Sequence, residues 1–176
     1  MNPKSGNRFS EETMPETRTT PSDAAISVAF LDHCGIERLY RKDGVCRGAV
    51  DVVPELTNPT GAAHGGLLMT LLDAILAGAC LSTLPETKMV ATIDMQVAFL
   101  TPGRGRLVAE GRLLRGTRAL MFAEGEVRND EGEIVARASG QFWILDRDRV
   151  KAKTKDKAGE KAKAGTPAQT DEASGA

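Results

Sequence analysis

The residue best suited to chemistry in this sequence is a carboxylate, Asp73, which stands alone in the most apolar segment of the chain. This segment reads GGLLMTLLDAILAGAC from Gly65 to Cys80, and Asp73 is its only charged residue. An ionised carboxylate is costly to bury among apolar side chains, so it is retained where it is paired, neutralised or used in a reaction. A polar approach containing Asn58, Gly61 and His64 precedes the segment. We therefore expect the chemistry to centre on Asp73 and this approach.

The pattern around Asp73 is that of one long helix and an extensive sheet. Apolar residues recur through 65–81 at helical spacing and on more than one face, which predicts a buried helix. A shorter helix is predicted over 22–33, with Ser22 and Asp23 as caps and Gly35 at its end. Strands are predicted at 36–40, 45–53, 89–100, 106–114, 119–127 and 134–145, with a turn at Asp43-Gly44 and the last four strands as an antiparallel meander. The prediction is an α+β fold in which an antiparallel sheet is wrapped around one long central helix.

The composition predicts one folded domain between two polar tails. Hydrophobic residues make up 41% and charged residues 27% of the 176 residues, which suits a soluble globular protein. Residues 1–21, rich in Thr, Glu, Pro and Ser, are predicted to be a disordered leader, and residues 148–176 a disordered Lys/Ala-rich tail. The domain is therefore expected at 22–147. A weak polyanion-binding role is the alternative interpretation of the tail.

Charge and cysteine usage disfavour several classes of function. The central part of the chain has a net negative charge, which makes it a poor candidate for binding nucleic acid. Its three cysteines are scattered without CxxC spacing, which argues against a metal site or a disulfide framework and fits a reducing cytoplasm. The first 21 residues lack an apolar signal region, and 65–84 is too short and interrupted to span a membrane. We expect a cytoplasmic protein without metal, cofactor, membrane or nucleic-acid partner.

The order of the motifs resembles that of the hotdog-fold acyl-CoA thioesterases. The pattern Asn58-x-x-Gly61-x-x-His64-Gly65-Gly66, followed by Asp73 on the helix, is similar to the signature of this family. The likeness is closest to the phenylacetate-degradation type within the 4-hydroxybenzoyl-CoA thioesterase superfamily. It continues through TIDM at 92–95, FLTP at 99–102 and AEGEV at 123–127, and covers about residues 30–145. The resemblance implies a hotdog fold, hydrolysis of acyl-CoA to a free acid and coenzyme A, and a homodimer or homotetramer.

Thioester hydrolysis requires a polarised carbonyl and either an activated water or a carboxylate nucleophile. The Gly65 N–H is a candidate oxyanion donor, because the first amides of a helix are unpaired and lie at the positive end of its dipole. Asp73 is the candidate general base or nucleophile, because an apolar surround makes a carboxylate a better base. The structural alternatives are close helix–sheet packing at the glycines and, for Asp73, a buried polar network at a subunit contact.

The spacing of these two residues predicts a site shared between subunits. Asp73 follows Gly65 by eight residues, which is about 12 Å along a helix axis. An oxyanion donor and a base must both lie roughly 3 Å from the reacting centre, which one helix does not readily achieve. Two antiparallel helices from two chains do. We therefore expect two equivalent sites across a two-fold interface, each with Gly65 of one chain and Asp73 of the other.

Three further residues are candidate catalytic groups, each with a structural alternative. The amide of Asn58 could bind the water or the thioester oxygen, or Asn58 could be a turn residue before Pro59. His64 could hydrogen-bond substrate or brace the loop. The hydroxyl of Thr92 could orient the water, or Thr92 could be a β-branched strand residue. Asp94, two residues later, is expected on the same face of the strand as Thr92.

The remaining candidates concern substrate binding. Gly66 lies beside the candidate oxyanion donor, and Arg115 and Arg118 flank a turn where they could contact the phosphates of coenzyme A; solvated turn charges are the alternative. The residues Leu67, Leu68, Leu71, Leu72 and Ile75 are expected in the core or at the dimer interface.

Two other functions stay open at this point. A hotdog dehydratase or hydratase acting on 3-hydroxyacyl or enoyl thioesters would combine a histidine with an acidic residue, whereas here His64 is followed by two glycines and the acid is Asp73. A non-catalytic acyl-CoA binding module would not need Asp73. Both comparisons favour hydrolysis.

Overall fold

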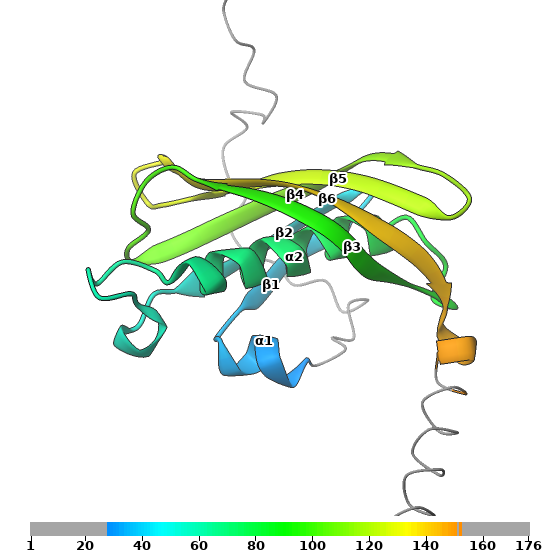
Figure 1. Cartoon of the computed structure of the whole chain (residues 1–176), viewed down its shortest axis with the longest axis horizontal. Coiled ribbons are helices and arrows are strands. Elements are labelled where there is room, and N and C mark those ends of the chain that lie inside the picture. Colours follow the sequence, from blue (N-terminus) through cyan, green and yellow to red (C-terminus); the bar gives the residue numbers. More distant parts are fainter. Residues whose placement is uncertain (1–27, 151, 153–176) are drawn as a thin grey trace, which may run out of the picture.

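The fold is a curved six-stranded antiparallel sheet laid over one long helix (Figure 1). The structure, a computed structural model, describes residues 28–150 and residue 152. The helices are α1 (Ala29–His33), the 3-10 turn η1 (Pro54–Leu56) and α2 (Gly65–Leu81). The strands are β1 (Glu37–Lys42), β2 (Val45–Asp51), β3 (Lys88–Phe99), β4 (Arg106–Gly116), β5 (Leu120–Arg128) and β6 (Ile134–Asp146). This confirms the predicted α+β fold with an antiparallel sheet wrapped around one long central helix.

Strand β3 lies at an edge of the sheet, far from its successor in the sequence. The strand order is β1-β2-β4-β5-β6-β3, so β3 pairs with β6 while β4 pairs with β2. The predicted meander is therefore right for β4, β5 and β6 and wrong for β3. The physical reason is that α2 crosses the concave face of the sheet and delivers the chain to the edge opposite β1 (Figure 1). Alternation identifies a segment as a strand, but it does not identify its neighbour.

Helix α2 packs closely against one face of the sheet. The five residues expected in the core or at an interface are all buried within this chain: Leu67, Leu68, Leu71, Leu72 and Ile75. The sheet approaches the helix closely where it carries glycine. A Cβ at Gly48 would lie 2.6 Å from Ile75 Cδ1, and one at Gly111 would lie 2.9 Å from Ile75 Cγ2. This close packing fixes the helix, and with it the polar residues at its ends and edge.

The N-terminal helix is shorter than predicted. Val28 has an extended backbone (φ −112°, ψ 102°), so α1 begins at Ala29, and residues 22–27 with the expected caps lie outside the described residues. The helix ends at Gly35 (φ 67°) as predicted, and the turn between β1 and β2 has positive φ at Asp43 and Gly44 as expected.

The predicted leader, 1–21, and most of the predicted tail, 148–176, also lie outside the described residues, so the domain boundaries stay predictions. The part of the tail next to β6 is helical at 147–150. Among the helices of the described residues, none has the length and apolarity needed to cross a bilayer.

The three cysteines are expected to be inert in the folded protein. Cys34, Cys46 and Cys80 are all free and buried, and burial raises the pKa of the Cys80 thiol to about 12. At pH 8 the reactive thiolate of Cys80 is then on the order of 10⁻⁴ of the total. We expect Ellman's reagent to titrate almost no thiol in the native protein within minutes and all three after unfolding in guanidinium. Rapid reaction of one native thiol would contradict this expectation.

Candidate active site

The N-terminus of α2 presents an available backbone N–H at Gly65. His64 is the N-cap: its backbone is extended (φ −61°, ψ 139°), and its Nδ1 accepts a hydrogen bond of 3.0 Å from the Gly66 N–H. The His64 carbonyl accepts the Leu67 N–H at 2.9 Å. Within residues 28–150 the Gly65 N–H has no hydrogen-bond partner. The amide predicted as the oxyanion donor is therefore open, whereas that of Gly66, a predicted substrate contact, is used by the cap.

Asp73 lies two turns further along α2, beside the edge strand β3. The Thr92 hydroxyl donates a 2.7 Å hydrogen bond to Asp73 Oδ1, which pairs two residues singled out from the sequence. Within residues 28–150 this is the only hydrogen bond of the Asp73 side chain. Asp73 is half-buried rather than enclosed, which corrects the expectation of a buried carboxylate in an apolar surround. The reason is that β3 is the last strand of the sheet, so no further strand of the described residues covers this flank of the helix.

A β-bulge in β3 separates Thr92 from Asp94. Thr92 pairs with Phe142, which is fully buried under the sheet, whereas Asp94 pairs with Gln141 on the outer face. The register shifts between these two residues, which places Ile93 in the bulge. Thr92 therefore faces α2 and Asp94 faces the opposite side, so the expectation that they share a face is wrong.

The side chain of Asn58 stabilises a turn through its Oδ1 atom. Its Oδ1 accepts hydrogen bonds from the Thr60 N–H (2.9 Å), the Thr60 hydroxyl (2.7 Å) and the Ala62 N–H (3.3 Å). These bonds are those of an Asn-stabilised turn, the structural alternative considered for this residue. Its Nδ2 group donates no hydrogen bond within residues 28–150. The NH₂ group is thus the part of the side chain that could reach a substrate.

Two residues near the start of α2 were not identified from the sequence as parts of the site. The ring of Phe99 is half-exposed and would lie 3.5 Å from a Cβ at Gly65, so it borders the candidate oxyanion donor. Arg104 donates hydrogen bonds to the carbonyls of Thr60 and Gly61. The sequence feature that indicates a loop of defined shape here is Gly61, whose φ of 71° favours glycine.

Arg115 and Arg118 lie away from the other candidates in this chain. Both are exposed at the β4–β5 turn, and neither forms an ion pair within residues 28–150. Arg115 pairs with Phe122, whose neighbours Met121 and Ala123 are buried under the sheet, so Arg115 belongs to the outer face. The structure therefore does not bring these arginines beside Asp73.

The candidate residues form two groups at different positions along α2. Asn58, His64 and Gly65 gather at its N-terminus, whereas Asp73 and Thr92 meet at its centre. The two groups are separated by about 12 Å of helix, so they do not converge on one reacting atom within a single chain. Among residues 28–150, no cluster of three or more His, Cys, Asp or Glu side chains could hold a metal ion.

Comparisons with known proteins agree with the fold. The family model for the thioesterase superfamily matches residues 60–136, a range that includes Gly65, Asp73 and Thr92. VNG_1336C of Halobacterium salinarum, named as a candidate esterase, is 36% identical over 127 residues, which cover 66% of this chain and 84% of that one.

Two further relatives carry more specific descriptions. YigI of Escherichia coli, a medium/long-chain acyl-CoA thioesterase, is 30% identical over 95 residues, which cover 46% of this chain and 61% of YigI. The crystal structure of BH2602 from Bacillus halodurans with CoA superposes with a TM-score of 0.62 at 26% identity, covering 68% of this chain and 77% of that one. These similarities confirm the family resemblance found in the sequence: the chain belongs to the thioesterase superfamily.

Proposed function

We propose that the protein hydrolyses acyl-CoA thioesters to a free acid and coenzyme A. The observation that carries the proposal is the Asp73–Thr92 hydrogen bond on a half-open flank of α2, together with the unpaired Gly65 N–H at the start of the same helix. A carboxylate beside a helix amide is the combination that acyl transfer from a thioester needs. The names of YigI, an acyl-CoA thioesterase, and of BH2602, crystallised with CoA, support coenzyme A as the thiol carrier.

The proposed mechanism assigns one task to each group. The Gly65 N–H donates to the thioester oxygen and stabilises the negative charge that develops there. Asp73 either removes a proton from the attacking water or attacks the carbonyl carbon itself. The Thr92 hydroxyl holds Asp73 Oδ1, which leaves Oδ2 directed to the reaction. The carbon–sulfur bond then breaks, and the thiolate of coenzyme A leaves and takes up a proton. Where Asp73 is the nucleophile, this step leaves a mixed anhydride, which a water then hydrolyses to release the acid and restore the carboxylate.

The complete site requires a second copy of the chain. Gly65 and Asp73 lie too far apart along α2 to act on one carbonyl from the same helix. The flank of α2 that carries Asp73 is bordered by the unpaired edge of β3, and Met69, Ile93 and Phe99 expose apolar side chains there (43%, 51% and 52%). Burial of such side chains favours association. We propose a homodimer, or a homotetramer built from it, in which β3 edges and α2 helices of two chains meet.

Arg115 and Arg118 stay candidates for the phosphates of coenzyme A. Because Arg115 lies on the outer face and Arg118 lies in the β4–β5 turn, they would serve only a carrier that extends beyond the sheet or onto the partner subunit. Neither guanidinium is paired with a carboxylate within the described residues, so both remain able to bind phosphate.

Thiol release from a panel of thioesters tests the proposed function. The panel contains acetyl-, octanoyl-, palmitoyl- and phenylacetyl-CoA, and we expect turnover of at least one with equal amounts of acid and coenzyme A. Crotonyl-CoA in the same assay, followed by loss of its enoyl absorbance, tests the hydratase alternative. Binding of the panel without turnover would show a non-catalytic module and contradict the proposal.

Replacement of Thr92 tests how Asp73 is held. Thr92→Val removes the hydroxyl that donates to Asp73 Oδ1 but keeps the shape and the strand preference of the side chain. We expect kcat to fall about 10-fold, because a misoriented catalytic group loses part of its advantage. Thr92→Ser, which keeps the hydroxyl, should stay close to wild type. Equal activities of the Val and Ser variants would show that the hydrogen bond has no catalytic role.

A further inference from the structure

The loop that precedes α2 has a defined shape but exposes two backbone acceptors. Residues 57–64 close on themselves through a bridge between Thr57 and Ala63, and through hydrogen bonds from the Asn58 N–H to the Ala62 carbonyl (2.8 Å) and from the Gly61 N–H to the Asn58 carbonyl (2.9 Å). Gly61 has φ 71°, a conformation that favours glycine. This turn directs the carbonyls of Thr60 and Gly61 away from the loop.

Arg104 binds both of these carbonyls at once. Its Nη1 donates to the Gly61 carbonyl at 2.7 Å, and its Nη2 donates to the Thr60 carbonyl at 3.0 Å. A planar guanidinium can bind two neighbouring acceptors with one rigid group, which an ammonium cannot do. The contact therefore fixes the orientation of the Thr60–Gly61 peptide as well as its position.

The segment that carries Arg104 is itself fixed to the core. The Gly103 carbonyl accepts the Ala63 N–H at 2.8 Å, which adds a third hydrogen bond between the β3–β4 connection and the loop. Gly103 is buried, and a Cβ there would lie 2.9 Å from Leu107 and 3.0 Å from Val135. The connection thus packs on core residues, and the hydrogen bonds of Arg104 attach the loop to this fixed segment.

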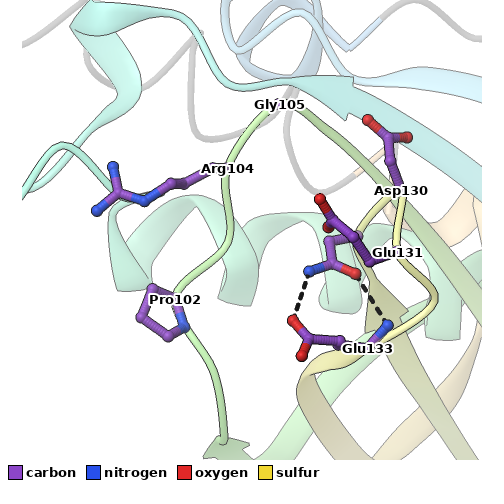
Figure 2. Close-up of a pocket in the computed structure, with 7 residues that line it drawn as sticks. Pro102, Arg104, Gly105, Asp130, Glu131 and Glu133 are labelled. Atoms are coloured by element: carbon purple, nitrogen blue, oxygen red, sulfur yellow. Dashed lines mark hydrogen bonds between the residues drawn. The ribbon is translucent and has the colours of Figure 1, made fainter.

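The surroundings of Arg104 show that the loop is its specific partner. A cleft of about 500 Å³ separates it from Asp130, Glu131 and Glu133 on the opposite wall. Figure 2 shows the guanidinium extending away from these carboxylates, and Arg104 forms no ion pair within residues 28–150. A turn charge without a structural role would be free to approach the nearby acids. Here it is used to hold two carbonyls.

We infer that Arg104 is a positioning residue for hydrolysis: it holds the Asn58–His64 loop so that the Asn58 amide and the first turn of α2 keep their places against the thioester. The inference rests on the proposed function. Because Arg104 is exposed and its acceptors lie at the surface, its loss removes little of the free energy of folding. Its effect is therefore expected in catalysis rather than in stability.

The kinetic test compares Arg104→Lys and Arg104→Ala with a matched control, Arg106→Ala, in the full chain. Arg106 follows the same connection as the first residue of β4, but it pairs with Glu37 and Asp51 instead of the loop. With the panel substrate of highest kcat/KM, we expect kcat of both Arg104 variants to fall about 10-fold, because small displacements of catalytic groups are costly. KM should change little, and added guanidinium ion should partly restore kcat of Arg104→Ala but not alter Arg106→Ala. Wild-type kcat in both Arg104 variants would overturn the inference.

A second measurement does not depend on turnover. Hydrogen exchange of the amides at 61–63 should be faster in Arg104→Gln than in wild type, and unchanged in Arg106→Gln. Unchanged exchange in Arg104→Gln would show that the clamp does not hold the loop, whatever the activity. If wild type cleaved no member of the panel, the proposed function would fail, and exchange would still decide whether the clamp exists.

Discussion

Asp73→Asn is expected to lower kcat for thioester hydrolysis by about 10³-fold, within the range of 10²–10⁴ that a general base contributes. The amide is nearly the same size as the carboxylate and can still accept the Thr92 hydrogen bond through its oxygen, so the fold and the position of the side chain are kept. Substrate binding should be retained. The measurement is the rate of coenzyme A release under saturating substrate, with the melting temperature as a check of folding.

Asp94→Asn is the matched control for this substitution. Asp94 follows Thr92 by two residues, but the bulge at Ile93 turns it to the outer face of the sheet, away from α2. We expect wild-type turnover in this variant. If Asp73→Asn and Asp94→Asn were equally active, Asp73 would not be the catalytic carboxylate and the proposed mechanism would be wrong.

Single-turnover hydrolysis in H₂¹⁸O separates the two roles proposed for Asp73. A carboxylate that acts as a base leaves both oxygens of Asp73 unlabelled, and the acid product carries ¹⁸O from the attacking water. A carboxylate that acts as a nucleophile forms a mixed anhydride, and when labelled water attacks the Asp73 carbonyl of that anhydride, the product keeps an oxygen of Asp73 and the label appears in Asp73.

Gly65→Pro is expected to reduce kcat by about 10²- to 10³-fold, the loss that follows removal of one oxyanion donor. Proline lacks the N–H but is well tolerated at the first position of a helix. The extended backbone of His64 (ψ 139°) is already that preferred before proline. Gly65→Ala keeps the N–H, and its Cβ would make an ordinary contact of 3.5 Å with Phe99, so it should remain active. Equal loss in both variants would point to packing instead of an oxyanion role.

Mixing the two inactive variants tests whether the site is shared between chains. In a dimer of one Asp73→Asn chain and one Gly65→Pro chain, one site has both groups intact and the other has neither. Random assembly should then recover roughly a quarter of wild-type activity per chain. If each site were built within one chain, every mixture would stay inactive, and the proposed two-chain site would be refuted.

Much of the fold followed from local pattern. The apolar spacing of 65–81 matched α2 at both ends, and the turn at Asp43-Gly44 has the predicted positive φ values. The hydrogen bond between Asp73 and Thr92 joins two residues that the sequence had suggested as parts of one site. These features depend on a periodicity or on a short motif, which a single sequence contains.

The predictions that were wrong or missing concern contacts between residues far apart in the sequence, and a residue that follows a β-bulge. The position of β3 beside β6 depends on where α2 delivers the chain, which alternation does not encode. The orientation of Asp94 depends on one bulged residue, and the role of Arg104 depends on a contact across more than 40 positions of the sequence. The half-open state of Asp73 reflects the edge of the sheet, so its surroundings in the proposed dimer cannot be predicted from one chain.

The bulge at Ile93 changes the phase of the whole edge strand. From Met95 to Phe99 the odd-numbered residues point to the helix, whereas before the bulge the even-numbered residues do, Thr92 among them. If all residues of β3 alternated without a bulge while Met95 to Phe99 kept their faces, the Thr92 hydroxyl would point outward and the carboxylate on the helix would lose its donor. The bulge thus lets one edge strand present both a polar donor, Thr92, and the side chains of Met95, Val97 and Phe99 to the same helix.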